Sequence, residues 1–198
     1  MKLYHSPASP YARKVRVCAI ECGLEEQLEL VLATPHDADD HLHQINPLGR
    51  VPALVTAEGW VLVDSPVICE YLDHLSAAPH PLFPTPGPRR WSALRRQALG
   101  DGIMDSAVPW RQELLRTEGP SQDLLSRRKH QITATLAFLM TLEPELDTID
   151  IGNISLACAL DYLLFRFGEH NWPERFPSLY EWHARFCSRD AFQRTRPE

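Results

Sequence analysis

Residues 6–15 read Ser-Pro-Ala-Ser-Pro-Tyr-Ala-Arg-Lys-Val and follow a short strand-like run, Lys2 to His5. Serine is a favoured N-cap and proline is favoured at the first helical position, so Ser9 and Pro10 predict the start of a helix. The N–H groups and the dipole of a helix start favour an anion, and the Ser9 hydroxyl adds a donor there. The stretch therefore predicts a strand-loop-helix corner that can bind an anion.

Strand and helix signals continue from this corner to about residue 75. We predict, in order, a helix near Pro10–Cys22, a strand near Gln27–Leu32, a short helix before Asn46, strands near Ala53–Thr56 and Val61–Val63, and a helix over Pro66–Leu75. With the first strand, this gives a βαβ-αββα order. That order indicates a mixed sheet with helices on both faces.

A proline-rich connector follows. Proline occupies five of the ten positions in residues 79–88, which prevents a helix and indicates a semi-rigid extended segment. Beyond it the apolar spacing is helical, and Asp150 is the expected N-cap of a central helix. We therefore predict an α/β domain over residues 1–78, a linker over 79–88 and an all-α domain over 89–198.

The composition is that of a globular protein. Of its 198 residues, 44% are hydrophobic and 23% are charged. No apolar run approaches the roughly 18 residues of a membrane span, and the first residues lack a signal-peptide core, so we expect a cytoplasmic protein without membrane association. The five cysteines are scattered and odd in number, which favours buried free thiols.

The charge is concentrated in the first part of the chain. Residues 1–78 hold 5 Lys and Arg against 11 Asp and Glu, whereas residues 79–198 hold 15 of each kind. An acidic surface repels polyanions, so nucleic-acid binding is not expected. An anionic ligand would instead need local donors such as Arg13, Arg16, Arg50 and the helix N-termini.

The corner at residues 6–15 resembles that of the thioredoxin-like superfamily, which carries C-x-x-C there, whereas this chain has Ser9 and Ala12. Together with Asn-Pro-Leu-Gly-Arg-Val-Pro-Ala-Leu at 46–54 and Asp-Ser-Pro at 64–66, it makes the whole chain similar to the cytosolic glutathione transferases, of the bacterial type with serine at the active position. The resemblance implies a thioredoxin-like domain followed by an all-α domain, a homodimer, and a role in detoxification.

The resemblance also implies a glutathione site. A helix start at residues 64–66 attracts a carboxylate while Asp64 attracts an ammonium, so Asp64 and Ser65 would hold the γ-glutamyl group. The Val51 backbone would pair with the cysteinyl unit in the manner of an added strand, next to a cis Pro52.

Three further residues complete the expected site. Arg50 matches a basic position that binds the glycyl carboxylate in some relatives, and His36 lies in a loop where other classes use a histidine for that carboxylate. Tyr11 would line the pocket, while Tyr4, a possible rival donor, is expected to pack in the core.

Ser9 would face the thiol of glutathione. A free thiol has a pKa of about 8.5, and lowering it by ~2 units takes about 2.7 kcal/mol. A hydroxyl hydrogen bond to the anion supplies roughly 1.5 to 3 kcal/mol and the helix start ~0.3 to 1. Ser9 is therefore the expected catalytic residue, with glutathione as co-substrate and a small hydrophobic electrophile as its partner.

Several alternatives remain open at this point. The acidic, histidine-rich segment at residues 36–43 could suggest a metal site, but it fixes no coordination geometry, and we expect no metal. The sequence contains no G-x-S-x-G motif, which argues against a serine hydrolase. A non-catalytic glutathione-binding or regulatory protein, or a glutathione-dependent peroxidase, disulfide reductase, dehalogenase or isomerase, would share the same fold and thiol site.

Overall fold

The structure is a computed structural model that describes residues 1–35, 41–142 and 148–197. It divides into two compact units: the first holds Met1–Arg90 and Asp190–Glu198, and the second holds Trp91–Arg189. The sequence placed all of residues 89–198 in the helical domain, whereas the structure groups residues 190–197 with the first unit. They belong to the first unit because helix α9 (Asp190–Arg194) packs against helix α1 (Pro10–Glu21).

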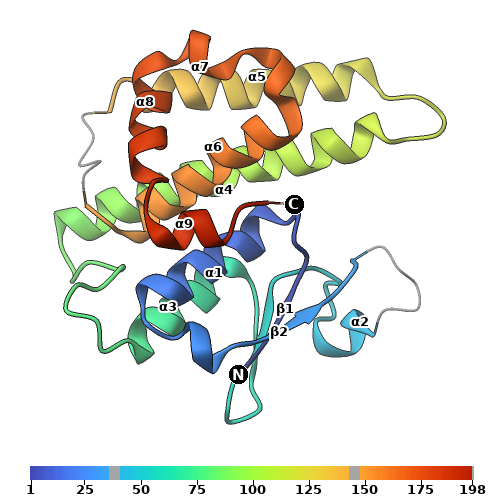
Figure 1. Ribbon diagram of the computed structural model, residues 1–198. Helices are drawn as coiled ribbons and strands as arrows, with labels where there is room; N and C mark the ends of the chain where they lie inside the picture. Colours follow the sequence, from blue (N-terminus) through green and yellow to red (C-terminus); the bar gives the residue numbers. More distant parts are fainter. Residues whose placement is uncertain (36–40, 143–147, 198) are drawn as a thin grey trace. The chain divides into compact units, whose positions relative to one another are not determined.

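The first unit is a four-stranded sheet with helices (Figure 1). After β1 (Lys2–His5) and α1, its elements are the 3-10 turn η1 (Glu25–Gln27), β2 (Glu29–Leu32), α2 (Leu42–Ile45), β3 (Ala53–Val55), β4 (Val61–Leu62) and α3 (Ser65–Leu75). The strand order is β2-β1-β3-β4, in which β1 and β2 are parallel and the other pairs are antiparallel. The predicted βαβ-αββα order is thereby confirmed.

The core of the first unit lies between the sheet and two helices. Helices α1 and α3 contact each other on one side of β1, and α2 lies on the other side in Figure 1. All five cysteines of the chain are free and buried, as predicted. Burial raises the pKa of Cys18 well above its usual value and that of Cys22 to about 12, so these two thiols stay protonated as core side chains.

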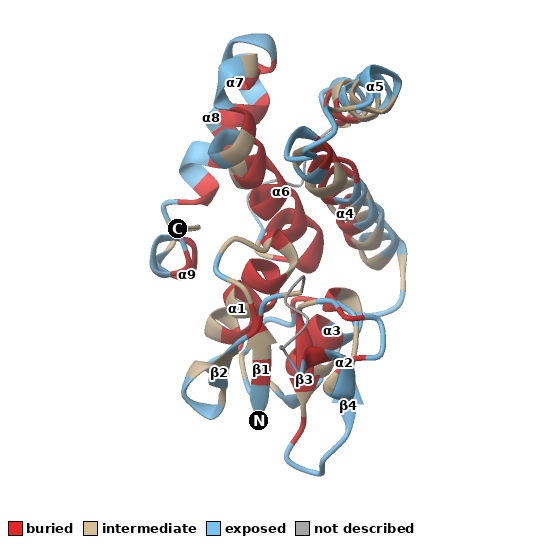
Figure 2. Cartoon of the chain, turned by 90° about the vertical axis from the view of Figure 1, so that its right-hand side faces the viewer, coloured by how far each residue is buried: buried red, intermediate tan, exposed pale blue. Residues whose placement is uncertain are grey.

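All secondary-structure elements in the described residues of the second unit are helices, as predicted. Its elements are α4 (Pro88–Leu114, which begins in the first unit), α5 (Gln122–Leu139), α6 (Ile151–Phe167), η2 (Gly168–His170), α7 (Trp172–Arg175) and α8 (Pro177–Phe186). Helix α6 is the centre of the unit, since its first ten residues, 151–160, are all buried (Figure 2).

Two glycines let α4 and α6 pack closely. A Cβ at Gly152 would lie 2.4 Å from the carbonyl oxygen of Ala93, and a Cβ at Gly100 would lie 2.7 Å from the carbonyl carbon of Ser155. Both obstacles are backbone atoms, which cannot swing aside as a side chain can. The absence of a side chain at these two positions therefore sets the distance between the helices.

The start of α6 is fixed by Asp150, the predicted N-cap. Its Oδ1 accepts a hydrogen bond from the Asn153 backbone N–H at 2.9 Å, and its Oδ2 accepts one from Arg96 Nη2 on α4 at 2.5 Å. The Asn153 side-chain amide donates to the carbonyl of Thr148, two residues before the cap, at 2.8 Å and so ties the chain before the helix to its first turn. The cap and the ion pair thus join α4 to the first turn of α6.

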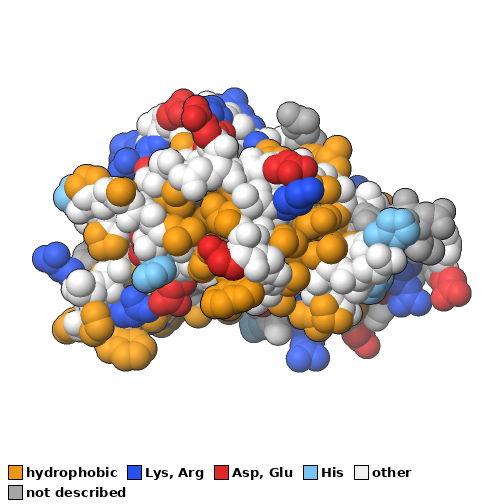
Figure 3. Space-filling model, turned by 90° about the horizontal axis from the view of Figure 1, so that it is seen from below, with side chains coloured by type: hydrophobic (Ala, Val, Ile, Leu, Met, Phe, Trp, Pro, Cys, Tyr) orange, Lys and Arg blue, Asp and Glu red, His pale blue; other side chains and the backbone are white. Residues whose placement is uncertain are grey.

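The surface is mixed in character. On the face in Figure 3, hydrophobic side chains gather in several patches, and acidic and basic side chains are scattered between them. None of the helices in the described part of the chain has the length and hydropathy needed to cross a bilayer.

Candidate functional site

Three segments of the first unit meet at one end of its sheet. Tyr4 pairs with Ala53 in the antiparallel β1–β3 ladder, so the residues after His5 run alongside those before Ala53. Leu54 pairs with Leu62 in the β3–β4 ladder, so the residues that follow β4 also reach this end. The register therefore gathers the loop that carries Ser9, the Val51–Pro52 pair and the Asp64–Ser65 pair at this end.

Ser9 occupies the N-cap of α1, as predicted. Its Oγ accepts a hydrogen bond from the Ala12 backbone N–H at 3.2 Å, and Pro10 is the first helical residue. The Ser9 backbone N–H donates to the Ser6 carbonyl at 3.0 Å, which fixes the loop in front of the helix. Because a hydroxyl both accepts and donates, the capped Ser9 retains its own O–H proton to offer to a ligand.

The segment before β3 is held by a turn over Asn46–Gly49. Asn46 is buried, its side-chain nitrogen donates to the Arg50 carbonyl at 2.7 Å, and its Oδ1 accepts from the Leu48 N–H at 3.0 Å. Gly49 has a φ of +61°, which a residue with a side chain rarely adopts. The turn presents Val51 at the sheet end, and the Val51–Pro52 peptide is cis, as the resemblance implied.

The N-terminus of α3 differs from the prediction by one residue. The sequence predicted a helix from Pro66, but the helix begins at Ser65, and Asp64 is the cap residue. Within the described residues no side chain caps this start, whereas Ser9 caps α1. Ser65 is buried and Asp64 is exposed, and the peptide between Val63 and Asp64 is cis. A helix start of this kind offers N–H groups to an anion beside a carboxylate that attracts a cation.

Arg50 and Tyr11, which were also predicted to belong to the site, differ in their exposure. Arg50 is exposed next to Val51, and Tyr11 is half-buried at the second position of α1. His36 lies outside the described residues. Tyr4 is half-buried in β1, on the face opposite Leu3, consistent with a packing role.

Arg13 does not serve as the surface donor that the sequence suggested. It is 4% exposed, and its Nη2 donates to the Phe192 carbonyl at 3.3 Å, while the guanidinium lies 5.7 Å from the centre of the Phe192 ring. Arg13 thus holds α9 against α1. Arg16, whose charge acts on His5, and Arg50 are positive charges near the sheet end among the described residues, and the N–H groups of the helix starts add to its attraction for anions.

His5 is a residue of this end that sequence analysis left without a role. It is the last residue of β1 and is buried, and its backbone carbonyl accepts from the Ala33 N–H at 2.9 Å. Burial, and then the charge of Arg16, lower the pKa of His5, so its imidazole is neutral at pH 7. Side chains alternate between the two faces of a strand, so the sequence could have shown that His5 lies on the same face as Leu3, which is the buried face.

The geometry suits an extended zwitterionic ligand. The N–H groups at the start of α3 and the Asp64 carboxylate can bind the two charges of an α-amino-acid head group. The backbone at Val51 can pair with a peptide, and Ser9 offers a hydroxyl at a second helix start. No cysteine lies in residues 6–12, so disulfide exchange through the protein at this corner is excluded.

Comparison with known proteins agrees with this geometry. Residues 8–75 match the family model "Glutathione S-transferase, N-terminal domain". The chain is 35% identical to the "Uncharacterized GST-like protein YibF" of Escherichia coli over 202 residues, which cover 100% of this chain and 98% of that protein.

Solved structures are also similar to it. A glutathione transferase family member from Pseudomonas fluorescens Pf-5 with bound glutathione is 40% identical, with a TM-score of 0.94 and coverage of 100% and 98% of the two chains. A structure from the same organism with bound S-(propanoic acid)-glutathione is 38% identical, with a TM-score of 0.91 and full coverage of both chains. This chain belongs to the glutathione S-transferase family.

Proposed function

We propose that this protein binds glutathione at the end of its sheet, ionises the thiol with Ser9, and transfers the sulfur to a small hydrophobic electrophile. The observation that carries the proposal is the meeting of Ser9, Val51 and the start of α3 at one sheet end. Each of the three matches a different part of the tripeptide. The glutathione-bound structure of the Pseudomonas fluorescens family member, 40% identical to this chain, supports the same ligand.

The head group of glutathione fits the start of α3. Its α-carboxylate would accept hydrogen bonds from the first-turn N–H groups and from the Ser65 hydroxyl, and its ammonium would lie near Asp64. The cysteinyl unit would pair with the Val51 backbone, in continuation of the strand register. The glycyl carboxylate would reach Arg50 or His36, and Tyr11 would line the pocket.

The Ser9 hydroxyl would act on the thiol. Its oxygen already accepts the Ala12 N–H, so the O–H proton can point to the sulfur as a hydrogen-bond donor. A hydrogen bond to a charged acceptor contributes about 1.5–3 kcal/mol, and a helix start adds roughly 0.3–1 kcal/mol. The sum of about 1.8–4 kcal/mol corresponds to a pKa lowered by about 1.3–3 units, which ionises a large fraction of the bound thiol near neutral pH.

The thiolate would then attack a carbon electrophile. The S–C bond forms as the leaving group departs with its electron pair, and the thiol proton passes to solvent. The structure of the Pseudomonas fluorescens relative with S-(propanoic acid)-glutathione supports an S-alkyl product of this type. We further propose a cytoplasmic homodimer with a role in detoxification, as the family resemblance implies.

Two variants in the same loop test the proposal. Ser9→Ala removes the donor, whereas Ser6→Ala removes a neighbouring hydroxyl and keeps the Ser6 carbonyl that binds Ser9. We expect conjugation of glutathione to an activated aryl halide to fall at pH 6.5 by about 10- to 100-fold in Ser9→Ala and to stay near wild type in Ser6→Ala. Equal rates in all three proteins would refute the role of Ser9.

Calorimetry of glutathione binding, together with the turnover assays, distinguishes the alternatives. Wild-type protein that binds glutathione but turns over no electrophile would indicate a non-catalytic binding or regulatory protein. Turnover of peroxides or mixed disulfides instead of aryl halides would indicate a reductase that uses the same thiolate. Absence of glutathione binding at millimolar concentration would overturn the whole proposal.

A further inference from the structure

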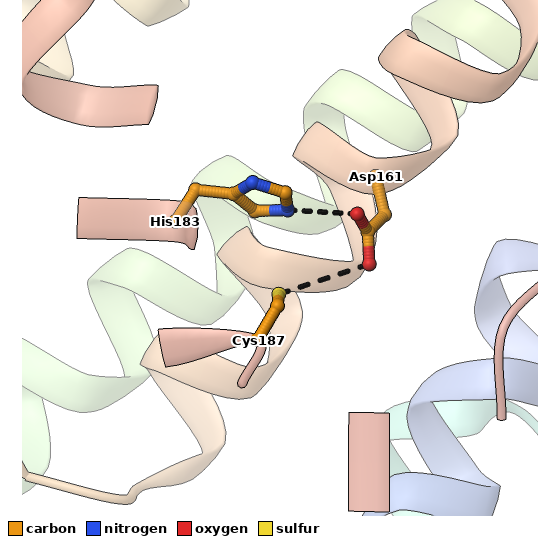
Figure 4. A group of neighbouring side chains, drawn as sticks. All are labelled: Asp161, His183 and Cys187. Carbon is orange, nitrogen blue, oxygen red and sulfur yellow. Dashed lines mark hydrogen bonds and ion pairs between the residues drawn. The ribbon is translucent and has the colours of Figure 1, made fainter. Parts of the chain in front are cut away.

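Three side chains of the second unit, far from each other in sequence, converge on one point (Figure 4). Asp161 lies on α6, and His183 and Cys187 lie on α8 and at its C-cap. One ligand-type atom from each residue, a carboxylate oxygen, an imidazole nitrogen and a sulfur, lies within 4.8 Å of the other two. His183 Nε2 is 2.9 Å from Asp161 Oδ1, and Cys187 Sγ is 3.7 Å from Asp161 Oδ2.

The helices explain the convergence. His183 and Cys187 are four residues apart, and the Cys187 N–H donates to the His183 carbonyl at 2.8 Å, so their side chains project on one face of α8. Helices α6 and α8 contact each other. Asp161 is the first charged residue of α6 after ten buried ones, and it faces the two α8 side chains in Figure 4.

The cluster is unusual because its charged and polar side chains are largely buried. The His183 and Asp161 side chains are 6% and 20% exposed, and Cys187 is 8% exposed. Although His183 Nε2 lies close to the carboxylate, it makes no hydrogen bond of acceptable geometry with any described residue. The imidazole nitrogen faces the carboxylate (Figure 4), so two potential metal ligands lie side by side in a buried place without a regular hydrogen bond between them.

We propose that Asp161, His183 and Cys187 form a binding site for a zinc-class divalent ion that links α6 to α8. A nitrogen, a sulfur and a single carboxylate select zinc or a similar borderline ion over magnesium and calcium, which require mostly oxygen ligands. Ligand bonds of about 2.0–2.3 Å to a tetrahedral ion place its donor atoms roughly 3.3–3.8 Å apart. The His183–Asp161 separation of 2.9 Å is below this range, the Cys187–Asp161 separation of 3.7 Å lies within it, and no pair of ligand atoms is more than 4.8 Å apart, so shifts of up to about 1 Å suffice.

Three protein ligands leave a fourth position for water. On binding, Cys187 gives up its thiol proton to solvent and the sulfur forms a bond to the ion, while His183 binds as the neutral imidazole. The charge of the resulting site, two positive from the ion and two negative from Asp161 and the thiolate, is zero. A neutral site is compatible with the low exposure of the cluster.

Cobalt(II) is the probe for the site, because a cobalt–thiolate bond gives an intense near-ultraviolet charge-transfer band. The full-length protein is stripped with a chelator and titrated with cobalt. We expect saturation at one equivalent with this band and the visible bands of tetrahedral cobalt, all displaced by zinc. At a hundredfold excess of zinc over its Kd, the Tm should rise by about 5 to 10 °C.

Matched variants locate the ion. Cys187→Ala should abolish the charge-transfer band, and Asp161→Asn should weaken cobalt binding at least tenfold, with both proteins folded by circular dichroism. Cys158→Ala, a change at another buried cysteine on the same helix as Asp161, should keep the band. The double variant His41→Ala/His43→Ala should also keep it, which separates this site from the histidine-rich segment.

Three outcomes would overturn the proposal. One is a failure of cobalt to saturate the wild-type protein at several-fold excess. Another is saturation without the sulfur band. The third is a band that survives in Cys187→Ala. Any of these would leave the cluster as a metal-free polar contact between α6 and α8.

Discussion

Replacement of Asp150 by alanine removes two buried interactions at once. Its Oδ1 caps α6 through the Asn153 N–H, and its Oδ2 pairs with Arg96 Nη2 at 2.5 Å, with side chains that are 8% and 5% exposed. Loss of an N-cap costs about 1 kcal/mol, and a buried charge without its partner costs roughly 3–5 kcal/mol. We therefore expect Asp150→Ala to lower the free energy of unfolding by about 4–6 kcal/mol.

A second substitution separates the two contributions. Arg96→Met in the Asp150→Ala background removes the unpaired guanidinium and keeps much of the side-chain volume, so it should restore most of the roughly 3–5 kcal/mol. Asp123→Ala, at an exposed acidic residue in the first turn of α5, is the matched control and should change stability by less than about 1 kcal/mol.

Urea unfolding followed by far-ultraviolet circular dichroism measures these differences. The reasoning predicts a much lower midpoint for Asp150→Ala, partial recovery in the double variant and a near wild-type midpoint for Asp123→Ala. A loss below about 1 kcal/mol in Asp150→Ala, or a double variant no more stable than the single one, would refute the assigned role of the ion pair.

Three further predictions concern the first unit. Gly49→Ala should destabilise the protein by about 1–3 kcal/mol, because its φ is +61° and the new Cβ would lie 2.2 Å from His43 Cε1; an unchanged urea midpoint would contradict this. Because the folded-state pKa of His5 is lowered, the unfolded state binds more protons below pH 6.5, so stability should fall as the pH drops from 6.5 toward the folded-state pKa. His5→Gln should flatten this slope in pH-dependent unfolding, and equal slopes would count against it. Arg50→Ala should raise the Kd for glutathione by up to about fivefold in calorimetry, less at high salt, because Arg50 is exposed; an unchanged Kd would remove it from the site.

Local signals predicted the element starts well. Ser9-Pro10 and Asp150 identify helix starts because capping depends on side chains within a few residues of the bonded N–H groups. The start of α3 was one residue off, since Asp64 and Ser65 are both good cap residues and sequence alone does not choose between them.

Contacts between residues far apart in the chain were not predicted from the sequence. The place of residues 190–198 in the first unit depends on α9 and on the bond from Arg13 to a carbonyl 179 positions away. For the same reason Arg13 was taken for a surface donor. The cluster of Asp161, His183 and Cys187 was missed because only its His-x3-Cys half is visible as a helical spacing, and the third member lies on another helix.

The candidate site could be predicted from the sequence only in part. The residue types at Ser9, Val51 and Asp64 suggested the ligand, but only the β1–β3 and β3–β4 registers show that the three segments reach one sheet end. The turn residue Asn46, whose side chain holds the Arg50 carbonyl, had no role before the structure assigned one.

The pKa of the bound glutathione thiol tests the central claim most directly. It is measured from the ultraviolet absorbance of the thiolate in a pH titration of the complex, in wild-type protein, Ser9→Ala and Ser6→Ala. We predict a pKa about 1.3–3 units below that of free glutathione in the wild type and in Ser6→Ala, and a return of about 1–2 units toward the free value in Ser9→Ala. A thiol pKa that is the same in Ser9→Ala and wild type would contradict the account.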